Sequence, residues 1–179
     1  MIFSVTRQIA IDAGHRIMTH GSKCRHLHGH RYTIEASSEA RHLHVSGEQT
    51  GMVIDFSFLK EEMMAEIDQP CDHGFIACCD DSDFLHALAP TSTDPEAWLS
   101  DLRDIVRITG YAAITDCLLG TKLYLVPGQP TAECLAKHWF ERLAPRVVAR
   151  SNGLAVLKTL TVWETPNCRA EYRPGGSCC

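Results

Sequence analysis

The spacing of apolar residues changes along the chain, and this change limits the folds that the chain can adopt. Residues 2–11, IFSVTRQIAI, alternate apolar and polar side chains, a pattern typical of a strand with one buried face. Residues 31–40, RYTIEASSEA, are a second extended run that predicts a strand beside the first. Farther on, four apolar residues follow a helical spacing after the predicted N-cap Asp55: Phe56, Leu59, Met63 and Ile67. The order strand, strand, helix favours an α+β fold.

A second helix is predicted after the segment PTAE at residues 130–133. Thr131 is placed to act as its N-cap, and Glu133 lies in the first turn, where the helix dipole favours a negative charge. The apolar stripe of this helix is broad and consists of Leu135, Ala136, Trp139, Phe140, Leu143 and Val147. Two further strands are predicted, from residue 154 in LAVLKTLTVWET and from residue 168 in CRAEYRP.

The stretch at about residues 77–121 is interpreted as a helical insertion. It contains TDPEAWLSDLRDIVRI, in which Asp94 and Pro95 form a sound helix start. The chain has 179 residues, no internal repeat and no low-complexity linker, so a single domain over 1–179 is expected.

Charge and hydropathy argue against two classes of partner. The formal net charge is -5 and no run of Lys or Arg stands out, so no nucleic-acid partner is expected. The first residues lack the pattern of a signal peptide, and nowhere do eighteen apolar residues run together. We therefore expect a cytoplasmic protein without a membrane partner.

The chain has nine cysteines, which we expect to be reduced in a cytoplasmic protein. Two adjacent pairs, Cys78 with Cys79 and Cys178 with Cys179, are poorly suited to bridges or chelation and are not expected to carry chemistry. The terminal GGSCC is predicted to be a disordered tail.

The segment KCRHLHGH at residues 23–30 gathers a thiol and three imidazoles. In a strand, His28 and His30 point to the same face, and Gly29 leaves room for close approach. Zinc binds such nitrogen ligands, and catalytic zinc sites typically have three protein ligands and an open position. By spacing alone the third ligand is open, with three candidates: His15, His20 and His26. A polar surface loop is the alternative interpretation.

Five pieces of the sequence together resemble one family. They are AGH at 13–15, CRHLHGH at 24–30, DH at 72–73, PTAE at 130–133 and WET at 163–165. They occur in the order found in the 6-pyruvoyltetrahydropterin synthase and 6-carboxytetrahydropterin synthase family. The resemblance implies zinc held by His15, His28 and His30. Three residues separate Cys24 from HGH, as in the bacterial carboxy enzymes.

The resemblance also implies roles for six other residues. Cys24 would abstract a proton, although its alternative is a fourth zinc ligand that closes the site. Asp72 would orient His73 as a proton relay, with a simple turn as the alternative. Glu164 would anchor the pterin by accepting two parallel N–H donors. Thr131 and Glu133 would assist it, but helix capping explains both equally well.

The family implies the tunnelling fold, a four-stranded antiparallel sheet with two helices on one face. Its subunits join as trimers, and two trimers stack as a hexamer. The implied reaction is conversion of 7,8-dihydroneopterin triphosphate into 6-carboxytetrahydropterin, on the path to queuosine. The alternatives are a pyruvoyl-forming or side-chain-cleaving lyase and, from another class, a non-catalytic zinc-stabilised assembly module.

Overall fold

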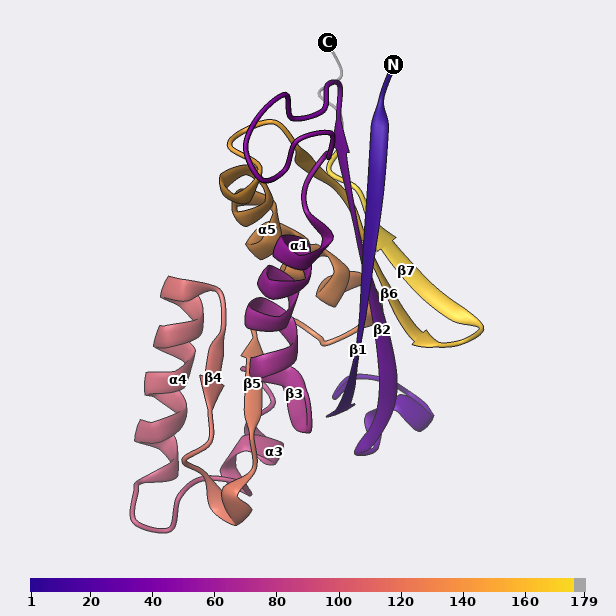
Figure 1. Cartoon of the computed structure of the whole chain (residues 1–179). Coiled ribbons are helices and arrows are strands. Elements are labelled where there is room, and N and C mark those ends of the chain that lie inside the picture. Colours follow the sequence, from indigo (N-terminus) through magenta and orange to yellow (C-terminus); the bar gives the residue numbers. More distant parts are fainter. Residues whose placement is uncertain (176–179) are drawn as a thin grey trace. The chain divides into compact units, whose positions relative to one another are not determined.

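The computed structural model describes residues 1–175, and its chain divides into two compact units. The first unit comprises residues 1–10, 32–69 and those from 135 onward. The second unit comprises residues 11–31 and 70–134. Strands β1 (Phe3–His15) and β2 (His28–Ala40) each contribute residues to both units (Figure 1). The prediction of one domain over 1–179 is not tested by this division and stays a prediction.

The first unit combines antiparallel strands with two helical segments. Strand β2 pairs with β6 (Val156–Thr165), and β6 pairs with β7 (Cys168–Tyr172), both antiparallel. The strand β1 lies alongside β2, where Thr6 Oγ1 is 2.7 Å from Ser37 Oγ. Both segments lie on one side of these strands in Figure 1: α1 (Phe56–Met63), continued by the π-helical turn η2 (Met64–Asp68), and α5 (Ala132–Arg150).

The predicted helix stripes form the core of the first unit. All six predicted apolar residues of α5 are buried. In α1 and η2 the residues Leu59, Met63 and Ile67 are fully buried, but Phe56 is 52% exposed, so its predicted place in the core is wrong. Phe56 is the first residue of α1, and the helix turns it away from the packed face. Asp55 caps α1 as predicted, accepting a hydrogen bond of 2.6 Å from Ser57 N.

The second unit contains the predicted insertion. Its strands are β3 (Gly74–Cys78), β4 (Ala112–Ile114) and β5 (Leu123–Val126). Its helical segments are η1 (Lys23–Arg25), α2 (Gln69–Cys71) apart from its first residue, α3 (Ser82–His86), α4 (Pro95–Thr109) and η3 (Leu118–Gly120). Asp94 caps α4 as predicted, and Gly110 ends it in the left-handed region at φ 86°. The helix packs Leu99, Leu102 and Val106 into one core with β3, β4 and β5.

The sheet is larger than the four antiparallel strands that were expected. Hydrogen bonding joins seven strands in the order β4-β5-β3-β1-β2-β6-β7, and the β1–β3 and β3–β5 pairs are parallel. The α+β class is confirmed, but the strand number is corrected. The strand β5, LYLV, is buried at every position, so it lacks the alternation that identifies a half-exposed strand.

Two sequence predictions concern features outside the core. No helix within residues 1–175 is long and apolar enough to cross a membrane. The seven cysteines of the same residues carry free thiols. Residues 176–179, which make up most of the predicted tail and include Cys178 and Cys179, lie outside the described residues.

Candidate active site

Three histidine side chains converge in the second unit. His15 ends β1, and His28 and His30 open β2. Their ring centroids lie 4.5, 5.0 and 5.1 Å apart, and one potential ligand atom from each ring lies within 4.8 Å of the other two. His28 and His30 alternate with exposed residues, so the strand period brings both rings to one face, as the sequence predicted. Three imidazoles in this arrangement can hold a metal ion.

Backbone carbonyls fix the orientation of two of these rings. Nδ1 of His15 is 2.9 Å from the Pro130 carbonyl oxygen, and Nδ1 of His28 is 2.7 Å from that of His26. A carbonyl only accepts, so each Nδ1 carries the proton and donates it, which leaves Nε2 as the atom that can bind a metal. The Pro130 carbonyl was not predicted, because a backbone acceptor leaves no signal in the sequence beyond its place in PTAE.

The His15 ring is held in the form that a metal ion requires. Its side chain is 1% exposed. Burial, the largest cause, and repulsion from the neighbouring imidazoles together lower the pKa of His15 from 6.5 to about 4, although the hydrogen bond to the Pro130 carbonyl raises it. The ring is therefore neutral at neutral pH. Neutral imidazole is the ligand form, so the chemistry of the three histidines fits a bound metal ion.

The backbone that follows His15 is anchored by side chains from distant segments. Arg16 donates to both carboxylate oxygens of the buried Asp81 at 2.6 and 2.5 Å. Met18 N donates to Gln129 Oε1 at 3.1 Å. These contacts hold the end of β1, and with it His15, against the segments around residues 81 and 129.

Gly29 permits a close approach, but the neighbour is the protein backbone. A Cβ atom added at Gly29 would lie 3.0 Å from the Ala13 carbonyl oxygen. The glycine therefore lets β1 and β2 pack closely at the histidines.

The two other candidate ligands and Cys24 do not join the three-histidine group. His20 accepts a hydrogen bond from Ser22 N at Nδ1, and His26 contributes its carbonyl to His28. Cys24 lies half-buried in η1, and its carbonyl accepts from Ile17 N at 2.7 Å. Among the described residues, the metal-binding group contains His15, His28 and His30 alone.

Asp72 and His73 form a hydrogen-bonded pair at the start of β3. Asp72 accepts from His73 Nδ1 at 2.6 Å and from Asp12 N at 2.8 Å. Burial raises the pKa of Asp72, but these two hydrogen bonds and the positive charges of His73 and Lys122 together outweigh it, so the net pKa lies below its usual value. The ionised Asp72 holds the proton of His73 on Nδ1, so Nε2 can exchange protons with another group.

The backbone at Asp72 and His73 is not extended, in contrast to a strand. His73 has a φ of 54°, so the dipeptide is not extended and its side chains do not diverge to opposite faces as a strand would require. Lys122 Nζ donates to the Asp72 carbonyl at 2.7 Å, and His73 N donates to the Asp12 carbonyl at 2.8 Å. His73 is 79% exposed. The supporting roles of Asp12 and Lys122 were missed, since neither lies near the DH pair in sequence.

The predicted substrate-binding residues fall in different units. Glu164 belongs to the first unit and lies on β6, where the pairing with β7 shifts register between Trp163 and Thr165. Such irregularities re-aim side chains and are frequent next to active sites. Thr131 and Glu133 belong to the second unit. Thr131 Oγ1 accepts from Cys134 N at 3.3 Å, which is the predicted N-cap, and Glu133 is exposed.

Comparisons with known proteins identify the family of the chain. The family model described as 6-pyruvoyl tetrahydropterin synthase matches residues 4–175. The 6-carboxy-5,6,7,8-tetrahydropterin synthase of Rickettsia conorii is 32% identical over 166 residues, which cover 93% of this chain and 96% of the relative.

Two solved structures share the fold. An uncharacterized protein from Wolinella succinogenes has a TM-score of 0.68 at 22% identity, covering 98% of this chain and 99% of its own. The 6-pyruvoyl tetrahydropterin synthase of Caenorhabditis elegans has a TM-score of 0.56 at 21% identity, covering 98% and 97%. The chain therefore belongs to the 6-pyruvoyl tetrahydropterin synthase family and is a pterin lyase of that family.

Proposed function

We propose that this protein is a zinc-dependent 6-carboxytetrahydropterin synthase. It converts 7,8-dihydroneopterin triphosphate and water into 6-carboxy-5,6,7,8-tetrahydropterin, acetaldehyde and triphosphate, as a step of queuosine biosynthesis. The observation that carries the proposal is the convergence of His15, His28 and His30 in a chain whose relative in Rickettsia conorii bears this enzyme's name.

The three histidines would hold the zinc ion. Nitrogen-only ligands suit zinc better than magnesium or calcium, which prefer oxygen. The Pro130 and His26 carbonyls support two of these rings, as outer-sphere acceptors commonly do for zinc-bound histidines. When bound, the ion would supply Lewis acidity toward the hydroxyl oxygens of the substrate side chain.

Cys24 is proposed as the general base. Its thiolate would remove a proton from a carbon of the substrate side chain, and its place outside the three-histidine group leaves the thiol available for this role. His73 would exchange protons with Cys24 or the substrate at Nε2, while Asp72 keeps the ring oriented through Nδ1. In the assembled protein, Asp72 and His73 would serve the zinc site of a neighbouring subunit.

Glu164 is proposed as the pterin anchor, assisted by Thr131 and Glu133. A carboxylate can accept both parallel N–H donors on the guanidine-like edge of a pterin. Glu164→Ala should weaken pterin binding by about 1.5–3 kcal/mol for each lost hydrogen bond and leave unfolding nearly unchanged. Equilibrium binding of a pterin to the parent and the variant measures this. Equal affinities would show that Glu164 is not the pterin anchor.

We also propose a cytoplasmic oligomer built from trimers, as a trimer or a hexamer. Strand β1 pairs with β3 only at residues 13–15, so the rest of that edge of β1 is open to a second copy. Strand β7 is the last strand of the sheet, so its outer edge is open as well. Light scattering at micromolar concentration should return a multiple of three chains.

One incubation tests the reaction directly. The purified protein, loaded with zinc, is incubated with 7,8-dihydroneopterin triphosphate, and the products are identified by mass spectrometry. Carboxytetrahydropterin and acetaldehyde are expected. A pyruvoyl product would identify the other activity of the family, and an unchanged substrate would favour a non-catalytic zinc-stabilised module.

A further inference from the structure

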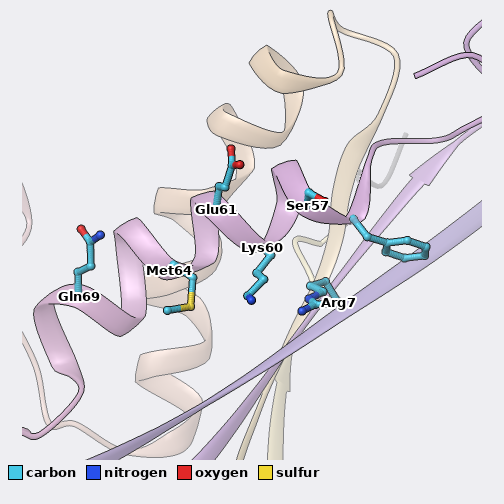
Figure 2. A pocket seen from close by; sticks show the side chains of 7 residues that line it. Arg7, Ser57, Lys60, Glu61, Met64 and Gln69 are labelled. Carbon is cyan, nitrogen blue, oxygen red and sulfur yellow. The ribbon is translucent and has the colours of Figure 1, made fainter. Parts of the chain in front are cut away.

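Two features of the molecule lie outside the three-histidine group. The first unit has a cavity of about 660 Å³, shown in Figure 2, which is lined by Arg7 of β1 and by side chains of α1 such as Lys60. This part of β1 is the edge that a second copy can pair with, so the cavity belongs to the proposed oligomer. The second unit has two adjacent free thiols, Cys78 and Cys79, which have no role in the proposed reaction.

A tight turn directs these two thiols toward one another. Strand β3 ends at Cys78, and Asp81 N donates to the Cys78 carbonyl at 3.0 Å, so residues 78–81 form a β-turn that leads into α3 (Figure 1). In an extended strand, neighbouring side chains would point to opposite faces. In this turn the Cys79 thiol instead donates a hydrogen bond to the Cys78 sulfur, so the two sulfurs lie in contact.

The surroundings favour the ionised form of one of the two thiols. The hydrogen bond from Cys79, the largest cause, and a second one from Asp80 N at 3.5 Å lower the pKa of Cys78, although burial and two nearby carboxylates raise it. The hydrogen bond to Cys78 and burial raise the pKa of Cys79, which therefore keeps its proton. The thiolate is the form that oxidants attack. The pair thus combines a reactive thiolate with a thiol that can complete a disulfide.

We propose that Cys78 and Cys79 are a modification site that hydrogen peroxide converts into a disulfide. The Cys78 thiolate attacks one peroxide oxygen, the O–O bond breaks, and a sulfenic acid and hydroxide form; the hydroxide takes up a proton. The Cys79 sulfur then attacks the Cys78 sulfur and displaces its hydroxyl group, which leaves as water with the Cys79 proton. Two electrons and two protons pass from the thiols to peroxide, which becomes two waters. Peroxide is small enough to reach side chains that are exposed by 4% and 7%.

Closing the bridge has to change the turn. Neighbouring Cα atoms are about 3.8 Å apart, whereas disulfides usually join Cα atoms that are about 4.4–6.8 Å apart. This mismatch makes adjacent cysteines poor structural bridges, and it makes the bond easy to reduce again, as a reversible modification requires.

The same turn carries the anchor of the histidine strand. Asp81 ends the turn, and its carboxylate accepts from Arg16 at 2.6 and 2.5 Å. Arg16 directly follows His15. A displaced Asp81 would therefore loosen the end of β1 that carries His15, and metal binding would weaken. This last step rests on the proposed function, whereas the formation of the disulfide does not.

Mass spectrometry of the full chain, treated with hydrogen peroxide, tests the site without a metal. After alkylation of free thiols and digestion, the peptide with Cys78 and Cys79 should be lighter by two hydrogen atoms and carry no alkyl group. Dithiothreitol should restore both thiols. Cys79→Ala should form a sulfenic acid at Cys78 and no bridge, whereas Cys168→Ala, at an exposed cysteine, should form the bridge as the parent does.

Hydrogen exchange of residues 13–18 then tests the anchor. Peroxide should speed this exchange at least about tenfold in the parent, because the local opening free energy falls, and should not do so in Cys79→Ala. Asp81→Asn should exchange faster already in the reduced protein. Zinc affinity of the parent should fall about 10–100-fold on oxidation, the size of an outer-sphere effect, and recover with dithiothreitol.

Three results would overturn the proposal. The first is full alkylation of Cys78 and Cys79 in protein whose exposed Cys168 has been oxidised. The second is a bridge from either thiol to another cysteine. The third is a bridge between the two that leaves exchange of residues 13–18 unchanged. A parent that binds no zinc, yet forms the bridge and then exchanges faster at these residues, would contradict the proposed function and support the modification site.

Discussion

Two groups of ionisable side chains, each with one buried member, are built in opposite ways. In the first unit, three acidic residues of α1 and η2 face three arginines of α5: Glu61, Glu62 and Glu66 with Arg142, Arg146 and Arg150. Glu66 is 6% exposed and pairs with both Arg142 and Arg146. In the second unit, three identical imidazoles gather with their rings 4.5–5.1 Å apart.

The difference lies in what offsets the cost of burial. In the ion-pair layer each charge meets an opposite charge within the same chain, so the layer links two helices and its desolvation is offset internally. The three imidazoles repel one another when protonated, and burial together with this repulsion lowers the pKa of His15 to about 4 and keeps its ring neutral at neutral pH. A metal ion bound by all three rings would supply favourable free energy that like side chains cannot give one another. A group of paired opposite charges is therefore expected to stabilise the fold, and a cluster of like side chains to serve function.

The largest effect should follow from removing one imidazole. His30→Ala should abolish tight metal binding and lower turnover more than about 10²-fold, since even outer-sphere changes cost 10–100-fold in metal affinity. Metal analysis and a turnover assay measure this. His20→Ala, which changes an exposed histidine outside the group, is the matched control and should retain both. Full metal occupancy in His30→Ala would contradict the assignment.

Cys24→Ala should show whether the thiol acts in catalysis or binds the metal with the three histidines. We expect the variant to retain its metal and its oligomeric state but to lose turnover by about 10²–10⁴-fold, the usual effect of removing an acid–base group. Cys168→Ala, at an exposed cysteine, serves as the control. If Cys24→Ala instead lost metal and stability together, Cys24 would be a fourth ligand. Turnover of Cys24→Ala at the parent rate would exclude a catalytic role for Cys24.

Breaking the ion-pair layer should affect stability and not activity. Glu66→Ala leaves two arginines without their shared carboxylate and should lower the free energy of unfolding by about 4 kcal/mol. Urea unfolding measures this. Glu141→Ala, in the exposed pair with Lys137, should change stability by no more than about 0.5 kcal/mol. A large loss of metal binding in Glu66→Ala would show that the two groups are not separable.

The smallest expected effect is a change of stability with pH in the metal-free protein. It is due to one histidine from each unit. Burial lowers the pKa of His15 and of His138 from 6.5 to about 4. The unfolded chain therefore takes up protons that the folded chain does not. Each contribution to stability is complete above pH 6.5 and is lost as the pH falls toward 4.

At pH 5.5 the loss should be about 1.4 kcal/mol for each of these histidines, relative to pH 7.5. Urea unfolding at the two pH values should show about twice the loss in the parent as in His138→Gln, where only His15 remains to contribute. If the loss disappeared altogether in His138→Gln, His15 would not be held neutral by the fold.

Local chemistry made several elements predictable from the sequence. The caps at Asp55, Asp94 and Thr131 and the apolar stripe of α5 depend on residues within one or two turns, so they can be read from neighbouring positions. The HGH spacing likewise places two imidazoles on one face, because alternation is a property of the single strand. The prediction that Phe56 is buried was wrong because a residue at the end of an apolar stripe need not face the core.

Long-range contacts decided the rest. His15 became the third member of the histidine group only because β1 meets β2 there, and spacing had left His20 and His26 equally open. Its orienting carbonyl is 115 residues away, and the backbone N–H that binds Asp72 is 60 residues away. The parallel strands β3 and β5 are joined across the insertion. The sequence by itself determined the residue types, the local periods and the caps. Tertiary structure decided burial, ring orientation and pKa, because each depends on atoms that distant segments bring together.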